Sequence, residues 1–251
     1  MLNEEENLDN KNEQGEPLLE DKRTLEPLPI WKRLYLFLMG SIGVVIISLI
    51  IAVALYSLPQ DYQIALAQNL TYIVLLVALI AIFVVDLPRL LSEFKKLRNY
   101  FYGLIMGLAL IGISAAYTNF VNLFYQYEVS DNETTLRSII SLYPALSLIV
   151  MGIVGPICEE LTYRVGLFGL VKKYNIVLAY VLSTLIFAFA HFGFTSKTIV
   201  NELVNLPVYV FSGLILTFTY HKFGFVGSMI AHMTNNLTTV TIVVISTFYT
   251  K

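Results

Sequence analysis

Charged residues are scarce in this chain of 251 residues. Asp, Glu, Lys and Arg together make up only 14% of the sequence, whereas a soluble globular domain averages about 25%. Hydrophobic residues account for 57%. This composition excludes a water-soluble enzyme, a nucleic-acid-binding protein and a disordered protein. It predicts a protein embedded in the lipid bilayer.

Cysteine is almost absent as well, since Cys158 is the one cysteine of the chain and an internal disulfide is therefore excluded. Two carboxylates follow Cys158 and disfavour its thiolate, so we interpret it as a packing residue rather than a nucleophile. The N-terminus also lacks the basic and apolar regions of a signal peptide. Residues 1–30 instead hold nine of the 18 acidic side chains, and we predict that residues 1–33 form an acidic, disordered tail.

Long apolar runs fill the rest of the sequence. Runs of about 17–25 residues can cross a bilayer as helices. We therefore predict an all-α, polytopic transmembrane bundle of seven or eight membrane helices. The principal segments are 34–58, 64–86, 100–125, 138–158, 175–194, 201–220 and 224–247.

The end of the fourth segment can be interpreted in two ways. Gly155-Pro156 can break a helix, because proline lacks an amide hydrogen and clashes with the preceding turn. Residues 158–172 therefore either continue the fourth segment or form an eighth helix. We divide the membrane part into N-terminal helices, residues 34–137, and a core that carries the motifs described below, residues 138–247.

Basic residues indicate the orientation of the chain, because short cytoplasmic loops carry an excess of Lys and Arg. With the N-terminus inside, 13 Lys and Arg residues fall on the inner side and three on the outer side. We therefore predict a multi-pass integral membrane protein with a cytoplasmic N-terminus.

A few ionisable and polar side chains interrupt the apolar segments, where burial is costly and a functional role is the first hypothesis. Glu160 and Arg164 are four residues apart and can pair on one helix face. Glu159 is turned about 100° away from Glu160. His232 and Asn236 also share a face. The full set is Glu159, Glu160, Arg164, His191, His232 and Asn236.

Four of these side chains are expected to reach overlapping depths. Counted from the turn after the fourth segment, Glu159 and His191 lie about 21 and 27 Å into the bundle. Counted from the turn before the last segment, His232 and Asn236 lie about 15 and 21 Å in. A carboxylate, two imidazoles and an amide that converge below the surface have the composition of a catalytic site.

Several chemistries fit this set. A desolvated glutamate can take a proton from water near neutral pH, and a His–Asn pair can stabilise an oxyanion. Glu159, His191 and His232 also form a possible Zn²⁺ ligand set, although the His-Glu-x-x-His pattern is absent. Structural explanations compete with these chemistries. Glu160 and Arg164 could form an ion pair that locks the helix, and His191, His232 and Asn236 could form contacts between helices. The joint occurrence favours one active site.

Three short motifs then stand in a recognisable order: E-E-x-x-x-R at residues 159–164, F-x-x-x-H at 187–191 and H-x-x-x-N at 232–236. This ordered triple in a polytopic chain resembles the CPBP (CAAX protease and bacteriocin-processing, or Abi) family of intramembrane proteases, which includes type II CAAX prenyl endopeptidases. The resemblance covers about residues 138–240.

The resemblance implies an intramembrane endopeptidase. In that family's mechanism Glu159 would activate water with help from His191, while His232 and Asn236 would form the oxyanion hole. Glu160 and Arg164 would support the site. We favour the version without a cofactor, with Zn²⁺ on Glu159, His191 and His232 as the alternative.

The resemblance leaves the substrate open. We expect a membrane peptide or membrane protein as substrate and a bacterial cell membrane as location. The main alternative is a non-catalytic immunity or regulatory scaffold protein. A small transporter is a third hypothesis, against which we count the lack of broken helices in matching halves.

Overall fold

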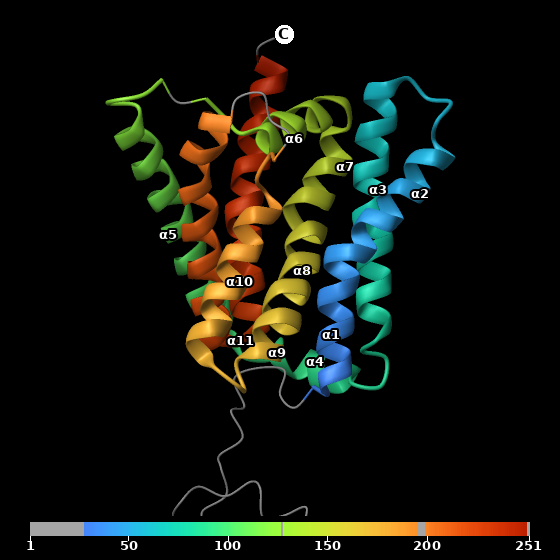
Figure 1. Cartoon of the computed structure of the whole chain (residues 1–251), viewed down its shortest axis with the longest axis vertical. Helices are drawn as coiled ribbons and strands as arrows, with labels where there is room; N and C mark the ends of the chain where they lie inside the picture. The colour runs from blue at the N-terminus through green and yellow to red at the C-terminus, as the bar shows by residue number, and fades with distance from the viewer. Residues whose placement is uncertain (1–27, 127, 195–198, 250–251) are drawn as a thin grey trace, which may run out of the picture.

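The computed structural model describes residues 28–126, 128–194 and 199–249, and within these ranges every regular element is a helix (Figure 1). The predicted all-α fold is confirmed. Elements labelled η are wide π-helical turns. The helices are α1 (Ile30–Leu38), η2 (Met39–Gly43), α2 (Val44–Ala54), α3 (Gln60–Ala81), α4 (Leu87–Glu93), α5 (Leu97–Val121), α6 (Asp131–Leu142), α7 (Pro144–Ile149), η3 (Val150–Val154), α8 (Gly155–Glu159), η4 (Glu160–Phe168), α9 (Gly169–Val171), α10 (Ile176–Ala190) and α11 (Ile199–Tyr249).

Within the described residues, five helices are long and apolar enough to cross a membrane: Ile30–Ala54, Gln60–Ala81, Leu97–Val121, Pro144–Val171 and Ile199–Thr247. The shorter apolar helix α10 stands beside them. The protein is accordingly an integral membrane protein. The last of these helices contains both of the final predicted segments. They are separated at Gly224, whose φ of 70° only glycine adopts readily.

Some predicted boundaries differ from the structure. The first membrane helix begins at Ile30, directly after Pro29, so residues 30–33 are helical rather than part of a disordered tail. The rest of the predicted tail, residues 1–27, lies outside the described residues. The fourth segment was expected to start at residue 138, but α6 ends at Leu142 and α7 begins at Pro144. The helix stops there because a residue that precedes proline is pushed out of the helical conformation.

Pro144–Val171 form one continuous helical run, so the chain is not interrupted at Gly155-Pro156. Pro156 lies inside this run, two residues after the wide turn η3. The wide turns η3 and η4 lie on either side of α8. Residues 158–172 therefore continue the fourth membrane segment and do not form an eighth helix.

Helices α5 and α11 pack closely because glycines line their contact. A Cβ atom added at Gly103 would lie 2.6 Å from the Gly227 carbonyl oxygen, and one added at Gly107 would lie 2.7 Å from the Ala231 carbonyl oxygen. Small residues four apart let the backbones of membrane helices approach in this way. The close approach fixes the helix that carries His232 and Asn236.

The start of α1 is fastened to the helix that carries the first motif. Arg33 Nη1 donates a hydrogen bond of 2.9 Å to the Val165 carbonyl oxygen in η4. The neighbouring Lys32 forms an ion pair with Asp86 and donates to the Ile82 carbonyl oxygen at 3.0 Å. The N-terminal helices and the motif-bearing helices thus form one bundle, with α6 at one end and α4 and α9 at the other (Figure 1).

Candidate active site

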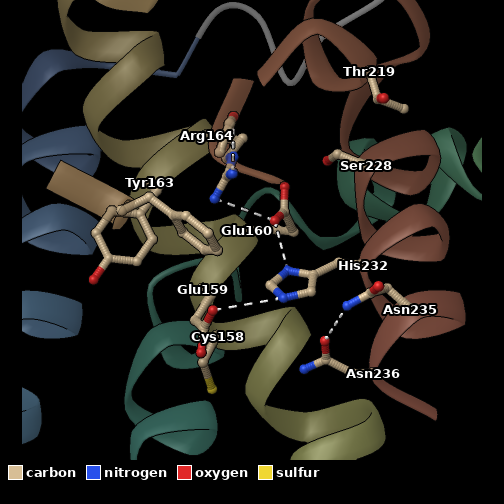
Figure 2. A network of polar contacts seen from close by, with 12 residues as sticks. Cys158, Glu159, Glu160, Tyr163, Arg164, Thr219, Ser228, His232, Asn235 and Asn236 are labelled. Atoms are coloured by element: carbon tan, nitrogen blue, oxygen red, sulfur yellow. Dashed lines mark hydrogen bonds and ion pairs between the residues drawn. The ribbon is translucent and has the colours of Figure 1, made fainter. Parts of the chain in front are cut away.

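Glu159 is the point at which the three motifs meet. It ends α8, His191 directly follows α10, and His232 lies in the second half of α11. Glu159 Oε2 is 3.8 Å from His191 Nε2 and 3.7 Å from His232 Nε2. Figure 2 shows His232 pointing toward Glu159 from the opposite helix. Side chains that are far apart in the sequence converge, as their predicted depths indicated.

Glu160 points toward the other nitrogen of the same imidazole. Its Oε1 lies 2.9 Å from His232 Nδ1 and 3.3 Å from Arg164 Nη1 (Figure 2). The side chains of Glu160 and Arg164 are both fully buried. His232 therefore bridges the two consecutive glutamates, with Nδ1 toward Glu160 and Nε2 toward Glu159. A buried charge pair of this kind holds its partners firmly, because removing one member leaves an uncompensated charge.

Arg164 also contacts the second motif. Its Nη2 donates to the Gly213 carbonyl oxygen at 3.3 Å, and its guanidinium carbon lies 4.4 Å from the centre of the Phe187 ring. That ring in turn contacts the imidazoles of His191 and His232, at centroid distances of 4.7 and 5.8 Å. Phe187 is a packing residue, and its packing orders both histidines.

The hydrogen-bond partners of the two histidines indicate where their protons lie. His191 Nδ1 is 2.8 Å from the Phe187 carbonyl oxygen, and His232 Nδ1 faces a carboxylate. An acceptor at Nδ1 requires a hydrogen there, so a neutral ring presents the lone pair of Nε2. Among the residues that the structure describes, none forms a hydrogen bond with Glu159 Oε2. Glu159 Oε2 and the two Nε2 atoms thus stand side by side. Glu159 and His191 can accept hydrogen bonds from a bound group, and His232 can donate one when its Nε2 carries a hydrogen.

Asn236 lies one helical turn beyond His232. Its Nδ2 donates to the Met151 carbonyl oxygen at 3.2 Å, and its Oδ1 accepts from Asn235 Nδ2 at 3.2 Å. A side-chain amide carries two N–H donors, so one donor of Asn236 is left for a ligand. The cavity beside it also exposes His191 and His232.

Two cavities flank the site and meet at His191. One, of about 510 Å³, lies among α5, α6 and α11 and has Asn236 and His232 in its wall. The other, of about 590 Å³, lies among η2, α3 and α10 and has Glu159 in its wall. A chain that passes from one cavity to the other would pass the groups described above.

Two tyrosines complete the site and were not predicted. The Tyr72 hydroxyl donates to Glu159 Oε1 at 3.4 Å, and the Tyr209 ring stacks on His191 at a centroid distance of 4.9 Å. Neither tyrosine belongs to one of the three motifs. The sequence feature that could have identified them is a hydroxyl-bearing aromatic residue inside an apolar segment. Cys158 is buried beside Tyr72, with Sγ 3.7 Å from its carbonyl oxygen, which agrees with a packing role.

The alternative Zn²⁺ set was tested against the geometry. Among the described residues, no three His, Cys, Asp or Glu side chains are arranged to hold a metal ion. Glu159, His191 and His232 have suitable chemistry for zinc, but they do not form a ready coordination shell.

These observations define an all-helical membrane protein with a Glu–His–His–Asn site inside its bundle. Residues 141–238 match the family model described as type II CAAX prenyl endopeptidase Rce1-like. This segment contains all six predicted site residues. The resemblance inferred from the three motifs is thereby confirmed over the segment.

Two curated relatives are similar to larger parts of the chain. UPF0177 protein YvdC of Lactococcus lactis subsp. lactis (strain IL1403) is 28% identical over 136 residues, which are 53% of this chain and 49% of YvdC. "Putative membrane peptidase YdiL" of Bacillus subtilis (strain 168) is 29% identical over 178 residues, or 65% of this chain and 67% of YdiL. The chain thus spans about half the length of YvdC. No solved structure matches it.

Proposed function

We propose that the protein is an intramembrane endopeptidase that hydrolyses a peptide bond of a membrane peptide or membrane-associated protein. The observation that carries this proposal is the convergence of Glu159 Oε2 with the Nε2 atoms of His191 and His232 between two cavities. The similarity to the Rce1-like family and to a protein named as a membrane peptidase supports it.

The proposed first step is the activation of water. A water molecule beside Glu159 would lie within hydrogen-bond reach of its Oε2 and of an imidazole Nε2 at once, because these atoms are 3.7–3.8 Å apart. Glu159 takes a proton from this water as the water oxygen attacks the carbonyl carbon of the substrate. His191, whose Nδ1 faces a neutral carbonyl, accepts the second hydrogen bond and orients the water.

The proposed second step is stabilisation of the oxyanion. In this step His232 donates from Nε2 to the oxyanion, while Glu160 holds the ring at Nδ1. The remaining N–H of Asn236 provides a second donor from the next turn of the same helix. When the tetrahedral intermediate collapses, the proton held by Glu159 goes to the leaving amine nitrogen.

The experiment is cleavage of a panel of synthetic membrane peptides by the purified protein in liposomes, with and without a zinc chelator. The matched variants are Glu159→Gln and Glu93→Gln, because Glu93 is a buried carboxylate that pairs with Lys96 away from the site. We expect cleavage by the wild type and by Glu93→Gln, no cleavage by Glu159→Gln, and no effect of the chelator.

Other outcomes would change the proposal. Chelator-sensitive cleavage that zinc restores would make Glu159, His191 and His232 ligands of a metal. Cleavage by Glu159→Gln at the wild-type rate would contradict the assigned base. If no peptide is cleaved and a cellular phenotype survives Glu159→Gln, the scaffold function replaces the peptidase.

A further inference from the structure

Glu202 is a buried carboxylate that belongs to none of the three motifs. From the sequence it lies at a segment edge near water, but in the structure it is only 1% exposed. Its Oε1 accepts a hydrogen bond of 2.7 Å from the Asp131 backbone amide, and its Oε2 accepts one of 2.9 Å from the Gly193 backbone amide. One side chain of α11 thus joins two segments that are distant in the sequence.

Both of these segments border the candidate active site. Gly193 follows His191 by two residues, and Asp131 begins α6, whose residues Asn132 and Glu133 line the same cavity as His191. Glu202 therefore joins the chain that carries the imidazole to the helix that covers the cavity.

Tyr209, seven residues further along α11, also connects the His191 segment to the start of α6. Its ring stacks on His191 with an interplanar angle of 21°, while its hydroxyl is 2.9 Å from Ser130 Oγ and accepts from Asn132 Nδ2 at 3.4 Å. The imidazole is thus fixed by its own helix through the Phe187 carbonyl, by the ring of Tyr209, and by the anchored chain behind it.

A carboxylate suits this position better than an amide. Two backbone N–H donors approach from different segments, and an ionised carboxylate offers an acceptor oxygen to each without offering a donor. Hydrogen bonds to an ionised acceptor are also shorter and about twice as strong as neutral ones. A glutamine in the same place would turn an N–H₂ group toward one of the two donors.

We propose that Glu202 is a positioning residue for the reaction, which holds His191 at its distance from Glu159 by anchoring Gly193 to α6. The inference rests on the proposed peptidase function. Glu202 does not reach the reacting atoms. It acts through the backbone that follows the imidazole.

The first test is the kinetics of Glu202→Gln on a peptide that the wild type cleaves, with Glu93→Gln as the control for loss of a buried carboxylate. We expect kcat to fall about 10- to 100-fold, because a small displacement of a catalytic group has effects of this size. KM should change much less than kcat, since Glu202 itself lines neither cavity, and Glu93→Gln should cleave normally. Unchanged kcat in Glu202→Gln, or an equal fall in Glu93→Gln, would overturn the proposal.

A second test needs no substrate, so it separates this inference from the peptidase function. Diethyl pyrocarbonate modifies exposed imidazoles, and the modification of each histidine can be followed by peptide mass spectrometry. We expect His191 to react several-fold faster in Glu202→Gln than in the wild type or in Glu93→Gln. Equal rates of modification would overturn the proposal. This outcome can be scored even if the wild type cleaves no peptide.

If Glu202→Gln does not accumulate, Gly193→Ala takes its place. A Cβ atom at Gly193 would lie 3.2 Å from Glu202 Oε2, which is close enough to push the carboxylate away without leaving a charge unpaired. The same fall in kcat and the same faster modification of His191 are expected. Wild-type values for both would contradict the anchoring role.

Discussion

At the scale of single residues, the two consecutive glutamates have different surroundings and therefore different chemistry. Glu160 is enclosed by Arg164 and His232 and is fully buried, whereas Glu159 keeps an oxygen without a protein partner and is 16% exposed on its side chain. A carboxylate that must accept a proton needs such a free oxygen. A carboxylate that holds an imidazole and a guanidinium in place needs no free oxygen.

We expect Glu159→Ala and His191→Ala each to abolish measurable cleavage while the protein still inserts and accumulates. Loss of a general base costs about 10²–10⁴ in rate, and neither side chain is fully buried. Peptide cleavage and the amount of protein in the membrane fraction are measured together. Wild-type turnover by both variants would rule out the assigned base.

Asn236→Ala tests the oxyanion assignment. Removal of one oxyanion donor lowers kcat about 10²–10³-fold, and we expect KM to change much less. The measurement is a full saturation curve for one cleaved peptide. An increase in KM with unchanged kcat would instead assign Asn236 to substrate binding.

Arg164→Ala is expected to act mainly through stability. It leaves the Glu160 carboxylate buried without its cation, which costs about 3–5 kcal/mol, and accumulation should fall strongly. The matched control is Arg137→Ala, because Arg137 and Glu133 form an exposed pair with the same i,i+4 spacing, where the loss is about 0–1 kcal/mol. Normal abundance of an inactive Arg164→Ala protein would show that this pair has a catalytic role.

At the scale of elements, the predictable features were those that depend on local sequence. Apolar length identified the membrane helices, and the i,i+4 spacing identified the ion pair of Glu160 with Arg164. The wide turns η3 and η4 and the contact of Tyr72 with Glu159 depend on the packing of distant helices, which no local pattern encodes. The burial of Glu202 likewise depends on a distant part of the chain, the start of α6.

The contact between α5 and α11 gives a test at this scale. We expect Gly107→Ala to destabilise the bundle by about 1–3 kcal/mol, the usual cost of overpacking, because its Cβ would lie 2.6 Å from Thr234 Cβ. Gly112→Ala on the same helix is the control, since no heavy atom lies within 4 Å of its added Cβ. Thermal unfolding in detergent measures both, and equal melting temperatures would contradict the packing explanation.

At the scale of the whole molecule, the two ends of the bundle differ in their residues. Lys172 and Lys173 follow α9 at the end where α4 lies, and α6 with its acidic first turn lies at the opposite end (Figure 1). Lys and Arg prefer cytoplasmic loops. The N-terminus-inside orientation that the sequence predicts would place Lys172 and Lys173 at the inner end and the cavity under α6 at the outer end.

Thiol labelling tests this orientation, and the buried Cys158 gives little background. We expect a membrane-impermeant maleimide to label Ser141→Cys in intact cells. Lys173→Cys should be labelled only after permeabilisation, because it lies at the opposite end of the bundle; both positions are exposed. The reverse pattern would invert the topology and move the mouth of the site to the cytoplasmic face.

At the pivot Gly224 the chain reverses, so that the two halves of α11 run side by side in opposite directions (Figure 1). His232 lies eight residues from this pivot and Glu202 twenty-two residues, or about 12 and 33 Å along the helix axes. If the first of these halves turned by about 10° about Gly224, Glu202 would move by about 6 Å. The hydrogen bonds of Glu202 and Tyr209 to the start of α6 lie far from the turn and therefore resist such a rotation effectively.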